Sequence, residues 1–365
     1  MINYVICFGL SLLVVTIGLK LFHLGERVVT PPAKRTTSSE RLSSTFDSVR
    51  PLIGFNIDAQ PPHPYAPWSG GKFQMTMGIR KTQEDSWLML DNRYREEQSL
   101  RERLLENERA GVLQCLDGSE AACRETLEHI IAFLTRRFPD LFFWSPNDSN
   151  YLCNGITGAA FRVVDPLEKH PLEIAARLVM EDMNLLIQGA GPDPDEHYLR
   201  ASFSMAPAGW YLQERIGWPL WKIHTPVPMW EEKLRKPIEK YFRNMKISTP
   251  VERMNFFMQT DKTLFQQEPF AAQRAENLKI QDIQVRHERQ TLRRLPRSRA
   301  ILFMVRTYLT PVVELASDKT SLYGLRESIR AMPEEMAEYK GRAIWGDVFG
   351  AWAERELVNY EHSEE

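Results

Sequence analysis

The sequence predicts an α+β protein, in which helices come first, then a sheet with helices packed on it, and then more helices. Apolar residues recur at helical spacing in three long stretches before residue 190. Beyond residue 197 the pattern changes to short alternating or apolar runs bounded by Pro and Gly, which is typical of strands. The chain has 365 residues, of which 43% are hydrophobic and 26% charged, so it can bury the core of one large domain.

The N-terminal segment predicts a membrane anchor. Residues 2–19 contain no charged side chain, and as a helix they would span about 27 Å, close to the thickness of the hydrocarbon core. The segment lacks the basic start and the small-residue cleavage site of a signal peptide. We therefore expect one transmembrane helix over residues 1–22, with packing of that helix on the folded domain as the alternative. Lys20, Arg27 and Lys34 follow it, and the positive-inside rule then predicts a single-pass membrane protein whose soluble domain faces the cytosol.

The composition divides the rest of the chain into three parts. Residues 23–58 form a predicted flexible tether, because residues 27–50 are rich in Thr, Ser, Pro and Arg and contain few apolar anchors. Residues 59–352 form the predicted folded domain, and residues 353–365 a C-terminal tail. The start of the domain is rich in Pro and Gly, which is typical of irregular structure. The large apolar side chain of Trp68 in this stretch suggests that the segment is extended and packs on the folded part.

The individual elements follow from periodicity and from start and stop signals. Ser119 is placed to cap the second helix, and Gly189 lies just beyond the end of the third. The predicted helices cover residues 94–108, 119–138, 171–188, 231–245, 321–332 and 334–339. The predicted strands cover residues 198–206, 256–259, 283–286 and 301–307, and residues 289–295 are left as a connection bounded by Pro296.

Charge and cysteine content argue against several classes of protein. The net charge is −2, which is unlike a strongly basic nucleic-acid binder, and we expect no nucleic-acid partner. Cys7 lies in the apolar leader. Cys115, Cys123 and Cys153 show no C-x-x-C spacing and no paired histidines, which argues against a disulfide framework and against zinc. The sequence has no Gly-rich phosphate loop, nucleophile elbow or H-E-x-x-H pair.

One histidine is set apart by its surroundings. His224 lies within residues 217–228, an apolar and aromatic segment stiffened by three prolines. An imidazole that binds haem iron needs an apolar surround and a rigid backbone. From residue type alone, a structural, hydrogen-bonded histidine is the more common alternative.

A basic cluster lies in residues 286–298, with Glu288 among five arginines. Planar guanidinium groups suit carboxylates, including haem propionates. A solvated basic run with Glu288 as an ion-pair partner fits the same charges equally well. His287 is a further ligand candidate, although charged residues flank it. Nearby, Glu252 and Arg253 are expected to form an internal salt bridge.

Several blocks, in order, resemble the haem-dependent oxidative N-demethylase-like family over residues 63–347. The most specific stretches run from residues 207–210 to 224–228 and over residues 288–298, followed by Arg306-Thr307-Tyr308. Further matching blocks lie at residues 65–68, 75–81, 85–88, 118–123, 171–179 and 181–182. Fungal members of the family often look like this chain, while its anchor and tether lie outside the family's catalytic pattern.

The resemblance implies a PAS-like antiparallel sheet with surrounding helices that binds haem b. It implies a monooxygenase that demethylates a secondary or N-methylated amine and releases formaldehyde, with electrons from NADPH through a separate flavin and iron–sulfur reductase. By the same resemblance, His224 is the expected axial ligand of the iron, and Glu288 and Tyr308 are the expected catalytic residues. Arg289 and Arg293 are then the expected contacts of the cofactor. Two alternatives stay open, namely a non-catalytic haem-binding sensor and a haemless, membrane-tethered interaction protein.

Overall fold

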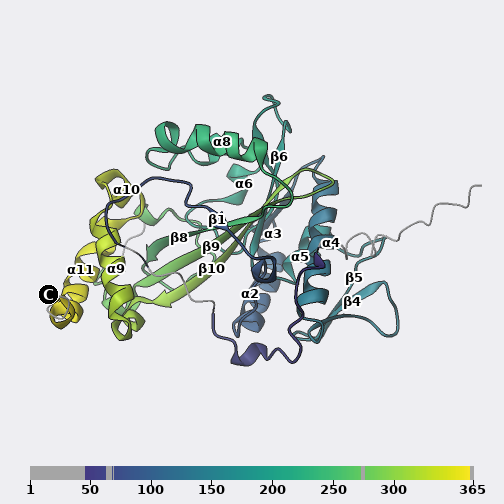
Figure 1. Cartoon of the computed structure of the whole chain (residues 1–365), viewed down its shortest axis with the longest axis horizontal. Coiled ribbons are helices and arrows are strands. Elements are labelled where there is room, and N and C mark those ends of the chain that lie inside the picture. Colours follow the sequence, from purple (N-terminus) through teal and green to yellow (C-terminus); the bar gives the residue numbers. More distant parts are fainter. Residues whose placement is uncertain (1–45, 63–67, 69, 273–275, 362–365) are drawn as a thin grey trace, which may run out of the picture.

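The computed structural model describes residues 46–62, 68, 70–272 and 276–361. In this part of the chain seven strands form one antiparallel sheet, in the order β1-β8-β9-β10-β6-β7-β2. The sheet runs through the middle of the molecule and helices lie on both of its sides (Figure 1). Its strands are β1 (Arg80–Lys81), β2 (Leu113–Cys115), β6 (Asp182–Gln188), β7 (His197–Phe203), β8 (Val251–Gln259), β9 (Gln284–Arg294) and β10 (Ile301–Pro311).

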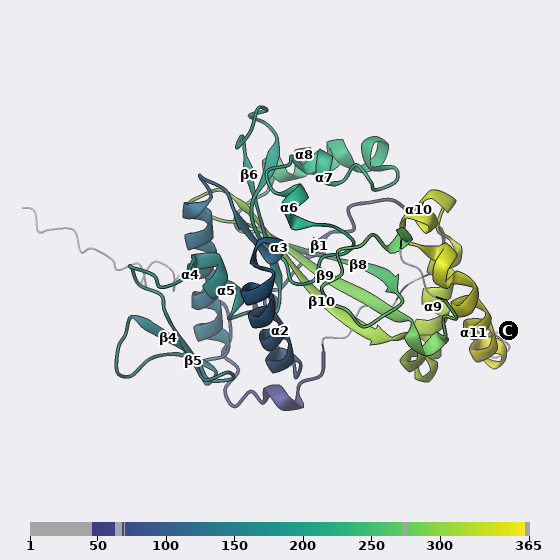
Figure 2. The same ribbon diagram turned by 180° about the vertical axis from the view of Figure 1, so that it is seen from behind.

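A smaller sheet and several short turns complete the strands and connections. The small sheet has the order β3-β4-β5 and projects beside α4 (Figure 2). Its strands are β3 (Phe142–Trp144), β4 (Tyr151–Asn154) and β5 (Ala159–Arg162). The 3₁₀ turns are η2 (Ile57–Ala59), η3 (Glu84–Ser86), η5 (Phe270–Ala272), η6 (Ile280–Asp282) and η7 (Val312–Ser317).

The strands β9 and β10 form the centre of the large sheet. They pair over their whole lengths, from Ile301 opposite Arg294 to Pro311 opposite Gln284. The other edge of β9 pairs with β8, and the other edge of β10 pairs with β6. Every residue of β9 is buried, although the strand carries four arginines and one glutamate. Buried charges are costly unless they are paired, so each needs a partner inside the protein.

The two faces of the sheet separate neighbouring residues of β9, because side chains alternate along a strand. On one face lie Arg289 and Arg293, together with Arg306 from the paired strand β10. We call this side the arginine face. Glu288 and Leu292 lie on the opposite side, which we call the glutamate face.

The arginine face is covered by the first described segment and by two long helices. These are α2 (Tyr94–Asn107) and α4 (Glu120–Arg137), against which α5 (Pro171–Ala176) packs. One hydrophobic core joins them to the sheet, with Phe46, Trp87 and Met304 among its members. Short helix α3 (Arg109–Val112) links α2 to β2.

The glutamate face is covered by four short helical elements that lie between β7 and β8 in the chain. They are α6 (Leu212–Arg215), α7 (Leu220–Ile223), a π-helical turn at Trp230–Leu234, called η4, and α8 (Arg235–Asn244). Figures 1 and 2 both show α8 alongside the sheet. Trp230 and Ile238 from these elements pack with Leu292 and Ile301 of the sheet in a second core.

A third group of helices closes one end of the sheet. It consists of α9 (Lys319–Arg330), α10 (Glu334–Tyr339) and α11 (Arg342–Glu361). These helices share a core with Val285 of β9 and Met258 of β8. The predicted α+β class and its antiparallel sheet are therefore present, with the helices at 94–108, 119–138, 321–332 and 334–339 close to their predicted positions.

One predicted helix is wrong. Residues 171–188 form only a six-residue helix, α5, and then the central strand β6. The first five residues of β6 are buried, since it lies between β7 and β10. A short apolar run buried on both sides has no alternation that would distinguish a strand from a helix.

Strands β8, β9 and β10 are longer than predicted, whereas β7 ends at Phe203 and not at residue 206. Residues 289–295 were expected to be a connection, but β9 continues through Arg294 and turns only at Pro296. This stretch was not predicted as a strand because it is rich in charged residues. Its arginines are accommodated by partners in the protein and not by solvent, as described below.

The part of the chain that the structure describes contains no transmembrane helix, contrary to the prediction. Among residues 46–62, 68, 70–272 and 276–361, no helix combines the length and the apolar character needed to cross a bilayer. The segment on which that prediction rested, residues 1–22, lies outside the described residues, as does the tether up to residue 45. The fold supported by the structure is therefore α+β with a large antiparallel sheet.

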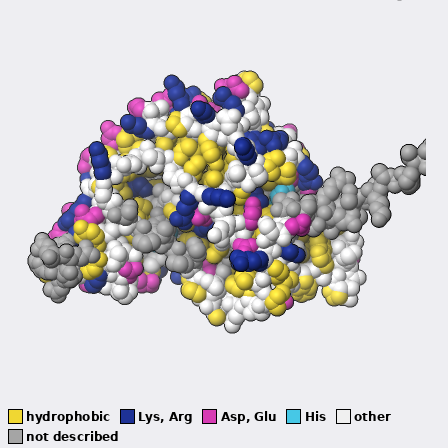
Figure 3. All heavy atoms as spheres, in the orientation of Figure 1, with side chains coloured by type: hydrophobic (Ala, Val, Ile, Leu, Met, Phe, Trp, Pro, Cys, Tyr) yellow, Lys and Arg dark blue, Asp and Glu magenta, His cyan; other side chains and the backbone are white. Residues whose placement is uncertain are grey.

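Both ends of the described chain are packed. At the start, Phe46 stacks on Trp87 with ring centroids 5.3 Å apart, and Val49 is buried in the same core. At the other end, α11 runs through the predicted tail region and buries Leu357. On the face shown in Figure 3, basic and acidic side chains are interspersed over the surface.

Candidate functional site

The site begins with a short, stiff segment on the glutamate face. Gly217 has a positive φ of 81°, which favours glycine, and its N–H donates to the carbonyl oxygen of Leu199 on β7 at 2.7 Å. Pro219 then precedes helix α7. These contacts fix α7 and the residue that follows it, His224, against the sheet.

The imidazole of His224 is oriented by its own backbone. Its Nδ1 lies 2.9 Å from the carbonyl oxygen of Leu220, and because a carbonyl only accepts, Nδ1 carries the proton. The other ring nitrogen, Nε2, makes no hydrogen bond to any residue that the structure describes. This is the arrangement in which the backbone sets the tautomer and leaves Nε2 with a free lone pair.

An indole ring covers one side of His224. Trp230 stacks on it with centroids 4.2 Å apart and planes 12° from parallel. Trp230 follows Met229, whose left-handed backbone (φ 58°) opens the π-helical turn. Burial lowers the pKa of His224 to about 4, and the positive charges of Arg215 and Arg253 act in the same direction. The imidazole is therefore neutral at physiological pH.

Two arginines near His224 were not among the predicted site residues. Arg215 ends α6, and its guanidinium carbon lies 5.2 Å from the ring centre of Trp210. Arg253 lies on β8, two residues from Asn255, on the glutamate face. The sequence signal that could have found Arg253 is strand alternation, which places it opposite to its neighbour Glu252.

The expected salt bridge between Glu252 and Arg253 is not formed. Glu252 binds Arg289 at 2.7 Å and Arg80 at 2.8 Å, both on the arginine side of the sheet. Since adjacent residues of a strand point to opposite faces, these two side chains cannot pair within β8.

Glu288 is held on the glutamate face by two amides and an arginine. Its Oε2 accepts hydrogen bonds from Asn255 Nδ2 at 3.2 Å and from Gln290 Nε2 at 2.9 Å. Its Oε1 lies 3.6 Å from Nε of Arg286. The carboxylate is only 5% exposed, so these partners fix its position and compensate part of its lost hydration.

Arg286 ties this carboxylate to the loop after β7. Its guanidinium donates to the carbonyl oxygens of Ala206 at 2.5 Å and Pro207 at 3.3 Å, and to Gln259 Oε1 at 3.2 Å. Pro207 opens the block of residues 207–210, which the family resemblance singled out. The structure thus brings that block and Glu288 together through one fully buried arginine.

A lysine also belongs to this group, although nothing in its local sequence predicted it. Lys340 Nζ donates to Asn255 Oδ1 at 3.4 Å and to the carbonyl oxygen of Phe256. Burial lowers its pKa to about 8, against the attraction of Glu288. Lys340 follows α10, so a segment far along the chain supplies a cation close to Glu288.

Arg289 and Arg293 lie on the opposite face of the sheet from Glu288. Arg289 binds Glu252 and the carbonyl oxygens of Ser86 and Trp87. Arg293 binds Glu84 at 2.6 Å, and its guanidinium carbon lies 4.0 Å from the ring centre of Trp87. Both guanidinium groups are therefore occupied in holding residues 82–87 on the arginine face.

Tyr308 lies on the arginine face as well. It is opposite His287 in the β9–β10 register, and the guanidinium carbon of Arg306 lies 4.6 Å from its ring centre. Its hydroxyl is buried without a hydrogen-bond partner among the described residues, and burial raises the pKa of Tyr308. His287, the second ligand candidate, lies against Trp68 with centroids 5.5 Å apart.

The structure therefore divides the predicted site residues into two groups. His224 and Glu288 lie on the glutamate face. The positive charge of Arg253 lowers the pKa of His224 and also that of Lys340, which lies close to Glu288. Arg289, Arg293 and Tyr308 lie behind the sheet. The roles predicted for all five stay predictions, but only the first two share a side of the molecule.

The comparison with known families agrees with the blocks noted in the sequence. A family model described as haem-dependent oxidative N-demethylase, alpha subunit-like, matches residues 78–349. The match covers the whole large sheet, α7 with His224, and the helices up to the first half of α11. By this match over most of its length, the chain belongs to the haem-dependent oxidative N-demethylase alpha-subunit-like family.

Proposed function

We propose that this protein is a haem-dependent oxidoreductase that oxidatively demethylates a secondary or N-methylated amine and releases formaldehyde. The observation that carries the proposal is His224. Its ring is neutral, stacked on Trp230 and held through Nδ1, and its unprotonated Nε2 has a lone pair that can bind a metal ion. The family match supports haem as the group that this nitrogen would hold.

The residues around His224 fit a haem by their chemistry. Imidazole Nε2 is a common axial ligand of haem iron, and Arg215 and Arg253 offer the guanidinium groups that suit two propionates. The buried Nε1 of Trp230 has no hydrogen-bond partner among the described residues, so it is a further donor for a bound group. Leu220, Ile223 and Trp230 belong to or pack against one hydrophobic core and supply an apolar surround.

Haem, when bound, would supply the oxygen activation that no side chain can provide. The remaining work falls to the protein. In this proposal Glu288 accepts or returns a proton of the amine, while Asn255, Gln290 and Arg286 hold its carboxylate in position. Packing of the helical elements on Leu292 and Ile301 keeps water away from this side of the sheet.

The electrons have to come from another protein in this proposal. The sequence carries no flavin or iron–sulfur signature, so NADPH would act through a separate reductase. The amine has to lose its ammonium proton before it is oxidised, and in this proposal Glu288 accepts that proton.

The test is an absorption spectrum of the full-length protein, expressed with haem supply. We expect a Soret band at about 400 nm, as is usual for protein-bound haem, which is lost or shifted in His224→Ala. His287→Ala is the matched control and should keep the band. A band that survives in His224→Ala and disappears in His287→Ala would move the ligand to the arginine face.

A second measurement separates an enzyme from a haem-binding sensor. Formaldehyde is assayed with N-methylated amines and an artificial reductant. Release of formaldehyde by the wild type, and its loss in His224→Ala, supports the demethylase. A haem-loaded protein that releases none with any amine tested would contradict it, and a colourless protein that takes up no haemin would remove haem chemistry altogether.

A further inference from the structure

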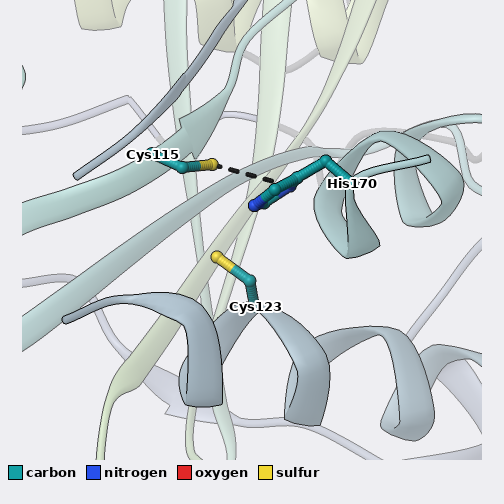
Figure 4. A group of neighbouring side chains, drawn as sticks. All are labelled: Cys115, Cys123 and His170. Carbon is teal, nitrogen blue, oxygen red and sulfur yellow. Dashed lines mark hydrogen bonds between the residues drawn. The ribbon is translucent and has the colours of Figure 1, made fainter. Parts of the chain in front are cut away.

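Three metal-ligating side chains meet on the arginine side of the sheet, where Cys123 belongs to the core of that face and Cys115 packs against it. Cys115, Cys123 and His170 each place a sulfur or a ring nitrogen within 4.8 Å of the other two. The Sγ of Cys115 lies 3.7 Å from Nδ1 of His170. Figure 4 shows the two sulfurs and the imidazole facing a common space.

The three residues come from three different elements, which explains why the sequence spacing argued against zinc. Cys115 ends β2 and pairs with Ala201 of β7. Cys123 lies in the first turns of α4, and His170 is the N-cap of α5, which packs on α4. No two of them share a short motif, but paired strands and packed helices bring them together.

The chemical state of the group suits a metal ion. The Nδ1 of His170 accepts a hydrogen bond from the Leu172 N–H at 3.2 Å, so this nitrogen carries a lone pair and no proton. The N-terminal end of α4, an 18-residue helix, favours a thiolate at Cys123.

We propose that Cys115, Cys123 and His170 bind one zinc ion, with a water molecule as the fourth ligand. Two thiolates and one imidazole are a known zinc ligand set that leaves one position open. Cys123 is fully buried, whereas Cys115 and His170 are half-buried, so the ion has a path from solvent on their side. Each thiol gives up its proton on binding, and the two thiolates then balance the charge of the ion.

Only small movements are needed to complete the site. Zinc bond lengths of about 2.3 Å to sulfur and 2.0–2.1 Å to nitrogen place tetrahedral ligands about 3.5–3.8 Å apart. The separation of Cys115 and His170 is already 3.7 Å, and the others close from 4.8 Å or less. The hydrogen bond from the Leu172 N–H to His170 Nδ1, 3.2 Å long, would be given up if Nδ1 binds the ion.

The energies favour binding over that hydrogen bond. One capping hydrogen bond is weak beside the bonds that two thiolates and one imidazole make to a zinc ion. The bound ion would therefore join the edge strand β2 to both helices behind the sheet. It would act as a structural link, independent of the proposed demethylation at His224.

The experiment measures zinc on the full-length protein, purified with a thiol reductant and stripped with a chelator. Zinc is added alone, in competition with a chromophoric chelator, and bound metal is counted by elemental mass spectrometry, which separates zinc from iron. We expect one zinc per chain. Cys115→Ser and His170→Gln should each weaken binding by at least about a hundredfold, since each removes a ligand.

Cys153→Ser is the matched control, because Cys153 is also half-buried but lies on β4 outside the group. It should bind zinc like the wild type. Cys123 is part of the hydrophobic core, so the half-buried residues carry the test, and circular dichroism checks that their variants fold.

Three results would overturn the proposal. They are a wild type that holds no zinc against the chelator, equal zinc binding in Cys115→Ser and the wild type, and an equal loss in Cys153→Ser. A Cys115–Cys123 disulfide found by mass spectrometry in protein kept under reductant would also overturn it, since it would remove both thiolates. Zinc should further raise the melting temperature of the wild type and leave that of Cys115→Ser unchanged.

Discussion

Asn255 and Glu288 face each other across β8 and β9, and the amide of Asn255 connects the carboxylate to a lysine. Its Nδ2 donates to Glu288 at 3.2 Å, while its Oδ1 accepts from Lys340 at 3.4 Å. An amide has one donor end and one acceptor end, so these two partners fix its orientation. Glu288 is thereby held in a network whose other end is a buried cation.

Replacement of Glu288 should separate haem binding from turnover. Glu288→Gln keeps the size of the side chain and removes its ability to take up a proton. We expect an unchanged haem spectrum and a rate of formaldehyde release about 10²–10⁴-fold lower, the usual contribution of a general acid or base. Unchanged turnover in single-turnover assays would show that Glu288 does not transfer the proton.

Asn255 is expected to act on the reaction through Glu288. In Asn255→Asp a second carboxylate would lie beside the first, and two like charges raise the pKa of the pair. The acidic limb of the pH–rate profile should therefore move to higher pH, whereas Asn255→Ala should lower the rate without that movement. Identical profiles for Asn255→Asp and the wild type would rule out the coupling.

The buried Arg306 should contribute strongly to stability. It is 1% exposed and binds Asp91 and Glu97, each at 2.8 Å. Arg306→Leu leaves two buried carboxylates without their partner, and we expect a loss of about 3–5 kcal/mol in the free energy of unfolding. Urea denaturation of the haem-free protein measures it.

The control for Arg306 is an exposed arginine with a comparable ion pair. Arg330 binds Glu354 at 2.9 Å, but its side chain is half exposed. Arg330→Leu should change the unfolding free energy by less than about 1 kcal/mol. Equal losses in both variants would mean that burial does not set the strength of these pairs.

Histidine burial predicts a loss of stability in mild acid. Burial lowers the pKa of His197 from 6.5 to about 4, and the charges of Arg294 and Arg243 lower it further. As the pH falls from 6.5 towards 4, the unfolded chain takes up a proton that the folded chain does not. Stability should therefore decrease across this window and be unaffected by His197 above it.

The variant His197→Gln tests this linkage. Between about pH 6.5 and 4, the unfolding free energy of the wild type should fall by about 1–3 kcal/mol more than that of His197→Gln. His224 and His287 have the same lowered pKa of about 4, so their shares of the slope should remain. A slope equal to that of the wild type would contradict the prediction for His197.

Two glycines on helices should respond in opposite directions to alanine. A Cβ on Gly324 of α9 would lie 2.2 Å from the carbonyl oxygen of Trp68, whereas one on Gly350 of α11 would meet nothing within 4 Å. Gly324→Ala should cost about 1–3 kcal/mol through the forced displacement of Trp68. Gly350→Ala should stabilise the helix by about 0.5–1 kcal/mol, and thermal denaturation compares the two.

The sequence predicted well those elements whose pattern is local. The helices α2, α4, α9 and α10 each bury one face and expose the other, so their apolar spacing is visible in the sequence. Strand β6 was misassigned as part of a helix because its neighbours bury it on both sides. Its burial depends on β7 and β10, which no pattern within residues 171–188 can reveal.

The candidate site was predictable only where a segment carries its own signal. His224 stands out by its prolines and aromatic neighbours, and the structure locks its ring within that segment. Arg289 and Arg293 were grouped with Glu288 because they are close in sequence. Once residues 284–294 are recognised as a strand, alternation alone puts Glu288 on one side and both arginines on the other. Lys340 and Arg215 meet the site only through tertiary packing.

The stacking of Phe46 on Trp87 sets a lower limit for any shortened form of this protein. The indole of Trp87 also contacts the guanidinium of Arg293 on the central strand β9. Phe46, Trp87 and Arg293 therefore form one stack, and Phe46 is its outermost member. Deletion of residues up to 49 would remove Phe46 and Val49 and leave a hollow over the indole, at a cost of several kcal/mol. Such a fragment could fail to hold any cofactor merely because it is incompletely folded, and a negative result with it would be misleading.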